Sequence, residues 1–285
     1  MSTQSANQIE SQIVNSISSE CGVWLFLGAA DTGKTTLVST IAAQLATTRM
    51  VAIVDADTGQ SHIGPPATVG WAIAKPNETD SANLPVEGIA FVGHISPVGH
   101  LLQMTGAIVK CVQKACSKKA TVLIDTPGFV SGSAACVFWW ELQRILKPKA
   151  IVAVNRQNEL DDIMRGLRNC GSTIETVKCS DTVTQKSPEQ RRAYRQERFA
   201  KYFADAKVYE IGLKNVGVQG DRRLSAEAAR GRLVGLRDGK GDDLAMGAIV
   251  ERGDEDKVIV KTPDIDPGKI ACIVVGDAMI DLPIG

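Results

Sequence analysis

The chain has 285 residues, of which 44% are hydrophobic and 22% charged, and its formal net charge is zero. This composition predicts a packed globular protein and argues against a general nucleic-acid coat protein, which needs an excess of positive charge. No stretch of 18 or more apolar residues occurs, so we expect no membrane span. The polar first 20 residues and the scattered cysteines, none in a CxxC pair, favour a cytoplasmic protein with reduced thiols.

Strand and helix patterns alternate along most of the chain. After a polar segment over 1–21, strands are expected at 23–28, 51–55, 89–93, 121–125 and 150–154, and helices at 34–47, 98–116, 134–146 and 159–169. Alternation of this kind is typical of parallel βαβ units, whose crossovers cover both faces of a sheet. We therefore predict an α/β domain over 22–215, built on a mostly parallel sheet flanked by helices.

The pattern changes after Gly217. Short apolar runs, separated by turns rich in Gly, Asp and Pro, occur at 232–236, 246–250, 257–261 and 270–275. This spacing predicts a small antiparallel β domain over 216–285.

Positive charge is concentrated in one part of the chain. Between Lys186 and Lys240 there are 14 Lys or Arg residues against 7 Asp or Glu residues. Such a segment suits a phosphate-rich second substrate, and a solvated helix face is the alternative. The adjacent Arg222 and Arg223 could contact an RNA backbone or could be ordinary surface residues.

The segment between the first expected strand and the first expected helix fits the phosphate-binding pattern G-x-x-x-x-G-K-[ST]. Its glycines let the backbone aim several N–H groups inward, and the helix N-terminus adds partial positive charge. Lys34 is expected to reach the β- and γ-phosphates of ATP or GTP, and Thr35 to bind Mg²⁺. The predicted nucleotide-binding residues are Gly28, Ala29, Ala30, Asp31, Thr32, Gly33, Lys34, Thr35 and Thr36.

Two further expected strands end in acidic residues at the same edge of the sheet. Asp55 and Asp57 lie at the end of the strand at 51–55, and Asp125 ends the strand at 121–125. Parallel strands direct their carboxyl ends toward the ligand crevice, so Asp57 and Asp125 are predicted to hold Mg²⁺ together with Thr35. A turn former or helix N-cap is the alternative for each aspartate, most of all for Asp55.

These motifs are compatible with two reactions. In a switch NTPase the nucleophile is water, and the segment from Asp125 to Gly128 senses the γ-phosphate. In a kinase the nucleophile is a hydroxyl of a second substrate, and Asp57 accepts its proton as general base.

An arginine-rich helix is expected at 188–203. Pro188 suits the first turn, and aromatic residues near the end supply an apolar face. Arg191 and Arg195 are four residues apart and lie on one side, where they could stabilise the charge of a transferring phosphoryl group. An exposed helix with salt bridges to Glu189 and Glu197 is the alternative.

Together these motifs resemble the polynucleotide 5′-hydroxyl-kinase family, which includes kinases of mRNA 3′-end formation, tRNA splicing and ribosomal RNA processing. The resemblance covers most of 22–285 and is carried by GAADTGKT, DADTGQS with IGPPATVG, VGHISPVGHLL, IDTPGF and RRAYR. Larger members of that family carry a β domain before the P-loop, and only about 20 residues precede it here.

The resemblance implies roles for individual residues. The catalytic residues that it implies are Lys34, Asp57, Gln60, Arg191 and Arg195. The family's clasp motif, Thr-x-Gly-Trp, corresponds to Thr126, Gly128 and Phe129, which are then expected to bind substrate. The reaction implied is transfer of the γ-phosphate of ATP to the 5′-hydroxyl of RNA or DNA, with RNA-processing proteins as possible partners.

Two other functions stay open. One is a GTPase or ATPase switch that acts through a binding partner, because the stretch 155–158 lies where a guanine-reading Asn-Lys-x-Asp would be, although the final Asp is absent. The other is a nucleotide-holding scaffold without turnover. The adjacent Trp139 and Trp140 could stack on a substrate base or pack against neighbouring elements.

Overall fold

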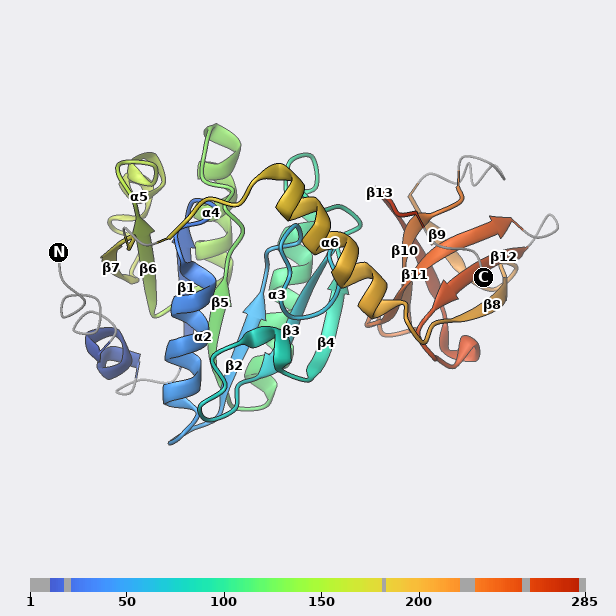
Figure 1. The fold of residues 1–285 in the computed structure, drawn as a ribbon, viewed down its shortest axis with the longest axis horizontal. Helices are drawn as coiled ribbons and strands as arrows, with labels where there is room; N and C mark the ends of the chain where they lie inside the picture. The colour runs from blue at the N-terminus through green and yellow to red at the C-terminus, as the bar shows by residue number, and fades with distance from the viewer. Residues whose placement is uncertain (1–10, 18–21, 181–182, 221–228, 253–256, 282–285) are drawn as a thin grey trace.

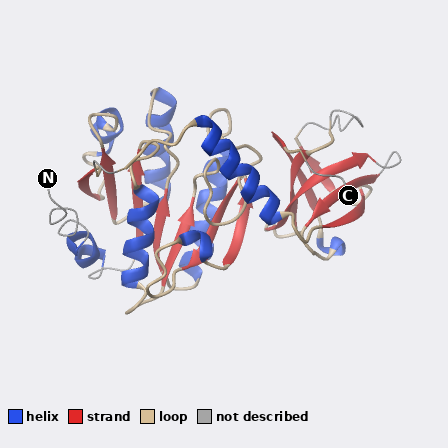
Figure 2. Ribbon diagram, in the orientation of Figure 1, coloured by secondary structure: helices blue, strands red, loops and turns tan. Residues whose placement is uncertain are grey.

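The computed structural model describes residues 11–17, 22–180, 183–220, 229–252 and 257–281. It contains a larger β-sheet covered by helices on both faces and a smaller β-sheet near the C-terminus (Figure 1, Figure 2). The predicted fold class is therefore confirmed. Arg222 and Arg223 lie outside the described residues. Within the described ranges, no helix is long and apolar enough to cross a membrane.

The first sheet has seven strands in the order β4-β3-β2-β5-β1-β6-β7. Their bounds are β1 Val23–Gly28, β2 Val51–Asp55, β3 Thr68–Ile73, β4 Val86–Phe91, β5 Thr121–Asp125, β6 Ala150–Asn155 and β7 Thr173–Lys178. β2, β5, β1, β6 and β7 pair in parallel, whereas β3 pairs antiparallel with both β2 and β4. The carboxyl ends of β2, β5 and β1 therefore meet at one edge, which carries the predicted site residues.

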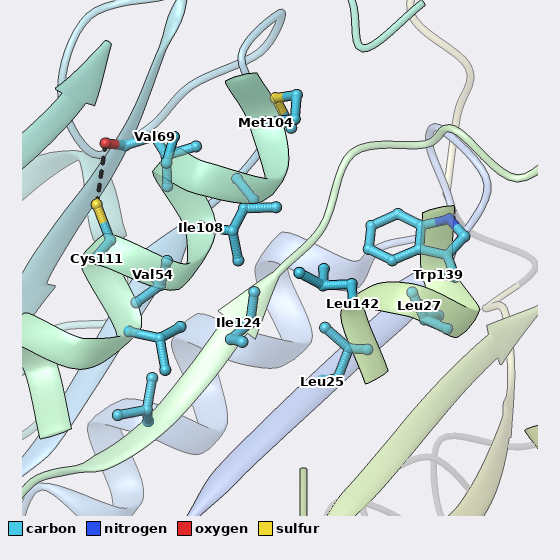
Figure 3. Packing of buried hydrophobic residues seen from close by; sticks show 14 of the residues in the cluster. Leu25, Leu27, Val54, Val69, Met104, Ile108, Cys111, Ile124, Trp139 and Leu142 are labelled. Atoms are coloured by element: carbon cyan, nitrogen blue, oxygen red, sulfur yellow. Dashed lines mark hydrogen bonds between the residues drawn. The ribbon is translucent and has the colours of Figure 1, made fainter. Parts of the chain in front are cut away.

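Helices cover both faces of this sheet because its central strands are apolar on both sides. One face packs against α3 Leu101–Ser117, α4 Ser133–Leu146 and α5 Asp161–Leu167, and the other against α2 Lys34–Leu45 and a helix at 11–17. Along β1 the side chains alternate: Leu25 and Leu27 face α3 and α4 (Figure 3), while Trp24 and Phe26 face α2.

Some elements depart from the expectations. The sequence pattern predicts no strand at 68–73 or 173–178, where β3 and β7 form. β7 is an edge strand with several polar, exposed side chains, so it lacks the apolar run of a buried strand. The helix at 11–17 lies in the expected polar segment, yet it buries Ile13 and Ile17 against the core.

The second sheet has six strands in the order β8-β12-β11-β10-β13-β9. Their bounds are β8 Lys207–Gly212, β9 Gly217–Gln219, β10 Arg232–Arg237, β11 Asp243–Arg252, β12 Lys257–Thr262 and β13 Cys272–Met279, and short 3-10 helices occur at Ser81–Asn83 and Pro267–Lys269. All pairings are antiparallel except the parallel pair of β13 and β9. Since β8 belongs to this sheet, the sheet begins before the expected boundary at 216.

The two sheets meet at a close backbone contact. A Cβ on Gly276 would lie 2.7 Å from the Cα of Gly93, so a larger residue does not fit. The N–H of Asp277 donates to the carbonyl of Gly93 at 3.0 Å. At the end of β4, the N–H of Phe91 donates to the carboxylate of Asp243 of β11 at 3.0 Å. These contacts join β13 and β11 to the β4 end of the first sheet.

The last helix, α6 Pro188–Tyr202, runs from above the first sheet to the second sheet (Figure 1). It begins at a capping box in which the side chain of Ser187 accepts from the N–H of Gln190 and the Gln190 side chain accepts from the N–H of Ser187. Pro188 occupies the first turn, where its missing N–H costs nothing. The sequence thus fixes where this helix starts, directly beside the P-loop.

Candidate nucleotide and phosphoryl-transfer site

The P-loop between β1 and α2 adopts its shape through glycines and close contacts. Gly33 has a φ of 84° and Asp31 a φ of 54°, so the loop enters the left-handed region twice. A Cβ on Gly28 would lie 2.6 Å from the carbonyl oxygen of Val154, so the strand cannot end in a larger residue here. The loop leads directly into the N-terminus of α2, which is the geometry of a phosphate cradle.

Lys34 is buried at the base of this loop. Its Nζ donates to the carbonyl of Ala29 at 2.6 Å, and Thr32 Oγ1 donates to the same carbonyl at 2.9 Å. Burial lowers the pKa of Lys34, and the carboxylates of Asp125, Asp57 and Asp31 oppose this shift. The lysine therefore lies among the acidic groups that the sequence placed in the site. Thr36 is exposed on the first turn of α2.

Asp125 meets the P-loop through Thr35. Thr35 Oγ1 donates to Asp125 Oδ2 at 2.6 Å, and Asp125 Oδ1 is buried without a hydrogen-bond partner. Burial, together with the charge of Asp55 beside it in register on β2, raises the pKa of Asp125 to about 7. A buried carboxylate oxygen without a donor, next to a P-loop hydroxyl, is a suitable ligand for a divalent cation.

The metal that the P-loop pattern implies fits these residues. Mg²⁺ beside a nucleotide usually takes one or two protein carboxylates and completes its shell with phosphates and water. The described residues contain no group of three or more His, Cys, Asp or Glu side chains that could hold a metal by themselves. Thr35 and Asp125 supply a site of the smaller, nucleotide-dependent kind.

The segment from Asp55 to Gly64 is organised around Asp55. Asp55 Oδ1 accepts from the N–H of Asp57 at 3.0 Å, and Oδ2 accepts from the N–H groups of His62 and Ile63 at 2.6 and 3.0 Å. Burial raises the pKa of Asp55 to about 7, and these backbone donors oppose the rise. Asp55 thus shapes the loop. This favours the role of turn former, which was the alternative to metal binding for this residue.

Asp57 lies on that loop and is only partly buried. Its Oδ1 accepts from the N–H groups of Gly59 and Gln60, both at 3.0 Å, whereas Oδ2 makes no hydrogen bond to any described residue. The charge of Asp57 acts on Lys34 and on Arg195. One carboxylate oxygen is therefore fixed by the loop, and the other remains available between the P-loop and α6.

The start of α6 connects the P-loop to the Asp57 loop. Arg191 forms an ion pair with Asp31, whose carboxylate also accepts from the N–H of Lys186 at 3.1 Å. Gln60 Nε2 donates to the carbonyl of Arg191 at 3.3 Å. The structure thus brings Asp31, Gln60 and Arg191 together at the start of α6.

Arg195 has different surroundings from Arg191, although both lie on one side of the helix. With Arg192 it lines a cavity of about 650 Å³ between α6 and the end of β13. Neither arginine has an ion-pair partner among the described residues. Burial lowers the pKa of Arg195, and the positive charges of Arg191 and Arg192 add to this effect.

The predicted clasp follows β5. Thr126 is 1% exposed, and its Oγ1 donates to the carbonyl of Phe26 at 2.6 Å, so its hydroxyl is committed to the core. A Cβ on Gly128 would lie 2.4 Å from the N atom of Ala30, so Gly128 packs directly on the P-loop. Phe129, the third clasp residue, has an aromatic ring that is only partly buried and can contact a substrate.

Three residues at the site were not singled out by the sequence analysis. Tyr194 donates to the carbonyl of Ser61 at 3.1 Å, Arg198 donates to the carbonyl of Gly64 at 2.9 Å, and Arg156 donates to the carbonyl of Asp31. Tyr194 and Arg198 follow Arg191 at intervals of three and seven residues, so their shared helix face was a usable signal. Arg156 follows the carboxyl end of β6, on the same sheet edge as the P-loop.

The two adjacent tryptophans differ in burial, since Trp140 is 38% exposed, but both are anchored to the protein. Trp139 is fully buried and its Nε1 donates to the carbonyl of Phe129 at 2.7 Å. Trp140 Nε1 donates to the carbonyl of Ile163 at 3.0 Å. Both indole N–H groups are therefore used inside the protein, which favours the packing alternative.

Relatives of known sequence share most of this chain. The polyribonucleotide 5′-hydroxyl-kinase of Methanocaldococcus jannaschii is 33% identical over 205 residues, a match that covers 71% of this chain and 56% of that protein. The protein of the same name from Pyrococcus furiosus is 36% identical over 201 residues, covering 69% of this chain and 54% of that protein. The chain thus spans about half the length of the curated relatives it matches.

A chain in the solved wild-type Clp1p–Pcf11p complex shares the fold, with a TM-score of 0.72 at 12% identity, over 98% of this chain and 82% of that chain. The family model described as "mRNA cleavage and polyadenylation factor CLP1 P-loop" matches residues 28–205. This range runs from the first P-loop glycine to just beyond α6, and so it contains the P-loop, Asp57, Asp125, the clasp segment and the arginines of α6. The chain belongs to the CLP1 P-loop family.

Proposed function

We propose that this chain is an ATP- and Mg²⁺-dependent polynucleotide 5′-hydroxyl kinase. The observation that carries the proposal is the placement of Asp57 on a loop that α6 ties to the P-loop through Gln60 and Arg191. A carboxylate with one uncommitted oxygen beside the phosphate cradle suits a reaction in which a second substrate must lose a proton. The names of the relatives from Methanocaldococcus and Pyrococcus support the same reaction, with RNA as acceptor.

Binding of the nucleotide falls to the P-loop. Its backbone N–H groups and the ammonium of Lys34 bind the phosphates, and burial of Lys34 strengthens that attraction because little water screens it. Thr35 and Asp125 hold Mg²⁺, which when bound neutralises charge on the β- and γ-phosphates. Asp57, whose charge acts on the ammonium of Lys34, contributes to this Mg²⁺ site through water.

Transfer of the phosphoryl group then needs a base and positive charge. The 5′-hydroxyl oxygen of the acceptor attacks the γ-phosphorus, the bond from the γ-phosphorus to the β–γ bridging oxygen breaks, and ADP leaves. Asp57 Oδ2 accepts the proton of the hydroxyl, a role that typically contributes about 10²–10⁴ in rate. Arg191 and Arg195 stabilise the charge on the transferring group, and Gln60 keeps Arg191 in place.

The acceptor strand approaches past Phe129 of the clasp, whose partly exposed ring can contact the terminal nucleoside, while Gly128 keeps this segment against the P-loop. The description of the family points to proteins of mRNA cleavage and polyadenylation as partners. A cytoplasmic location stays a prediction from the sequence.

The switch alternative has no specific support in the structure. It relied on the stretch 155–158 as a guanine reader, but Arg156 is engaged with the P-loop carbonyl of Asp31. Glu159 accepts from the N–H groups of Arg156 and Gln157, both at 2.7 Å, which orders this turn internally.

The proposal is tested by incubating the protein with γ-labelled ATP, Mg²⁺ and matched RNA and DNA oligonucleotides. We expect label on strands with a 5′-hydroxyl, no label on strands with a 5′-phosphate, and no transfer by Lys34→Ala. Release of labelled phosphate to water without labelled oligonucleotide would support the switch, and retention of nucleotide without any reaction would support the scaffold.

A further inference from the structure

The cavity beside Arg195 is built from four parts of the chain that are distant in sequence. It is formed by α6 and the residues just after it, the loop that follows β4, Lys261 of β12 and the end of β13, and it has a volume of about 650 Å³. Pockets for small organic ligands have volumes of about 300–1,000 Å³. Phe199 of α6, Phe203 directly after it, Ile95 of the loop and Met279 at the end of β13 give it an apolar wall.

Three cations surround this apolar wall. Arg192 and Arg195 come from α6 and Lys261 from β12, and none of them has an ion-pair partner among the described residues. Two carboxylates also line the cavity, Asp277, which pairs with Nε2 of His100 at 2.8 Å, and Asp281, so the cations outnumber the carboxylates by three to two. The surface therefore combines aromatic side chains with unpaired positive charge, which is how proteins bind single-stranded nucleic acid without reading its sequence.

The cavity adjoins the place where the acceptor hydroxyl must lie. A Cβ on Gly59 would be 2.8 Å from the carbonyl oxygen of Ile95, so the cavity wall touches the loop that carries Asp57. Arg195 lines the cavity, and its pKa is influenced by the charge of Asp57. A strand whose 5′ end reaches Asp57 can therefore continue into the cavity.

We propose that this cavity binds a nucleotide of the acceptor strand that lies downstream of the phosphorylated 5′ end. Its base packs on the apolar wall, and its phosphate is bound by Arg192 and Lys261, which leaves Arg195 for the transferring phosphoryl group. This proposal rests on the kinase function proposed above. An acidic peptide is a weaker candidate, because it would leave the aromatic wall without a planar partner and the link to Asp57 without a purpose.

The test compares acceptors of increasing length. The acceptors are a nucleoside 3′-monophosphate, a dinucleotide and single-stranded RNA of about ten nucleotides. For the wild-type protein we expect the KM to fall by about tenfold or more once the strand is long enough to enter the cavity. In Ala200→Trp, which fills the cavity from an exposed position of α6, and in Lys261→Gln, this gain from length is lost.

A matched control removes a cation from the same strand outside the cavity. Lys257 of β12 pairs with Glu210 at 2.6 Å and does not line the cavity, so Lys257→Gln should keep the full gain from length. Equal length dependence in the wild type, Ala200→Trp and Lys261→Gln would overturn the proposal, as would a KM that is independent of length.

Binding of a 3′-labelled RNA, followed by fluorescence anisotropy, separates this proposal from the kinase function. Binding that Ala200→Trp weakens by about tenfold, without transfer to any acceptor, would refute the kinase alone. Transfer with unchanged RNA binding in both variants would refute the cavity alone. Loss of binding to an acidic peptide but not to RNA in the same variants would assign the cavity to a protein partner instead.

Discussion

The burial of Asp125 is unfavourable for stability, and a role in binding a cation explains it. It is 2% exposed, one of its oxygens has no donor, and a second carboxylate, Asp55, lies beside it in register. Burial and this neighbour raise the pKa of Asp125 to about 7. Such groups cluster at functional sites, where a bound cation supplies the missing positive charge.

The raised pKa makes a prediction about stability without metal. Because the pKa of Asp125 is about 7 in the folded chain and near 3.8 when unperturbed, the folded state binds more protons between these values. The free energy of unfolding should therefore fall as the pH rises from about 4 to about 7, and Asp125→Asn should remove about 1–3 kcal/mol of this fall. Urea unfolding in the presence of a chelator measures both.

A matched control for this prediction is Asp162→Asn, which changes an exposed carboxylate on α5. It should keep the pH dependence of the wild type. The same slope in Asp125→Asn as in the wild type would show that Asp125 is not the group that titrates. Asp125→Asn should also weaken the Mg²⁺-dependent binding of nucleotide, since an amide oxygen carries no full charge.

The site residues differ in how far the sequence could predict them. Gly28 to Thr35 are contiguous and sit between a strand and a helix, so their pattern was sufficient to predict the position of this loop. Asp55 and Asp57 are two positions apart at one strand end, so the sequence does not distinguish their roles. The structure does, because Asp55 accepts hydrogen bonds from backbone N–H groups of the loop, whereas Asp57 keeps one oxygen available. The bond from Arg156 to Asp31 depends on β6 lying beside β1, which no local pattern reveals.

Among the elements, α6 has the most direct influence on the site. Its own burial is slight, yet it holds the Asp57 loop through Gln60, Tyr194 and Arg198 and reaches the P-loop through Arg191. Tyr194 and Arg198 donate to backbone carbonyls of the loop, whereas the bond from Gln60 to the carbonyl of Arg191 depends on a side chain of the loop. This helix is therefore a positioning element for catalysis.

Loss of one of these anchors should lower turnover more than nucleotide affinity. Arg198→Ala removes the donor to the carbonyls of His62 and Gly64, and we expect kcat for phosphoryl transfer to fall about 10- to 100-fold, because small displacements of a base cost large factors in rate. The control is Lys201→Ala, an exposed position on the same helix. Equal kcat in both variants would show that the loop holds its shape without α6.

The strands show where local patterns succeed and fail. β2 and β5 are buried at every residue and match the expected 51–55 and 121–125. β8 and β7 alternate or expose polar side chains, and β3 carries Gly70, so their hydrophobic signal is weak. Their pairing depends on contacts with the neighbouring strands of the sheet, and a local stretch of sequence does not include those strands.

In the whole molecule, the second sheet is joined to the first through β4, Gly93 and Asp243. The family model ends at residue 205, so this sheet lies beyond the matched region. The junction nevertheless forms one side of the cavity next to Arg195. The relative placement of the two sheets should therefore matter for binding of the acceptor strand.

The buried ion pair at this junction allows a direct test. Asp243 is 1% exposed at its side chain, pairs with Arg237 at 2.9 Å and accepts from the N–H of Phe91. Asp243→Ala leaves the buried N–H of Phe91 without its acceptor and should lower the free energy of unfolding by about 1–3 kcal/mol. Glu210→Ala, which breaks the exposed pair with Lys257, should cost less than about 1 kcal/mol. Similar losses of unfolding free energy in Asp243→Ala and Glu210→Ala, measured by denaturant unfolding, would mean that the junction is not held by this pair.

The central claim is that Asp57 accepts the proton of a 5′-hydroxyl beside a bound nucleotide. The most direct measurement compares the wild type with Asp57→Asn for two quantities, the affinity for ATP and the single-turnover rate of label transfer to a 5′-hydroxyl RNA. We predict transfer by the wild type, a rate lower by about 10²–10⁴ in Asp57→Asn, and ATP affinity that changes little. Transfer at the wild-type rate in Asp57→Asn, or no transfer by the wild type, would contradict the account.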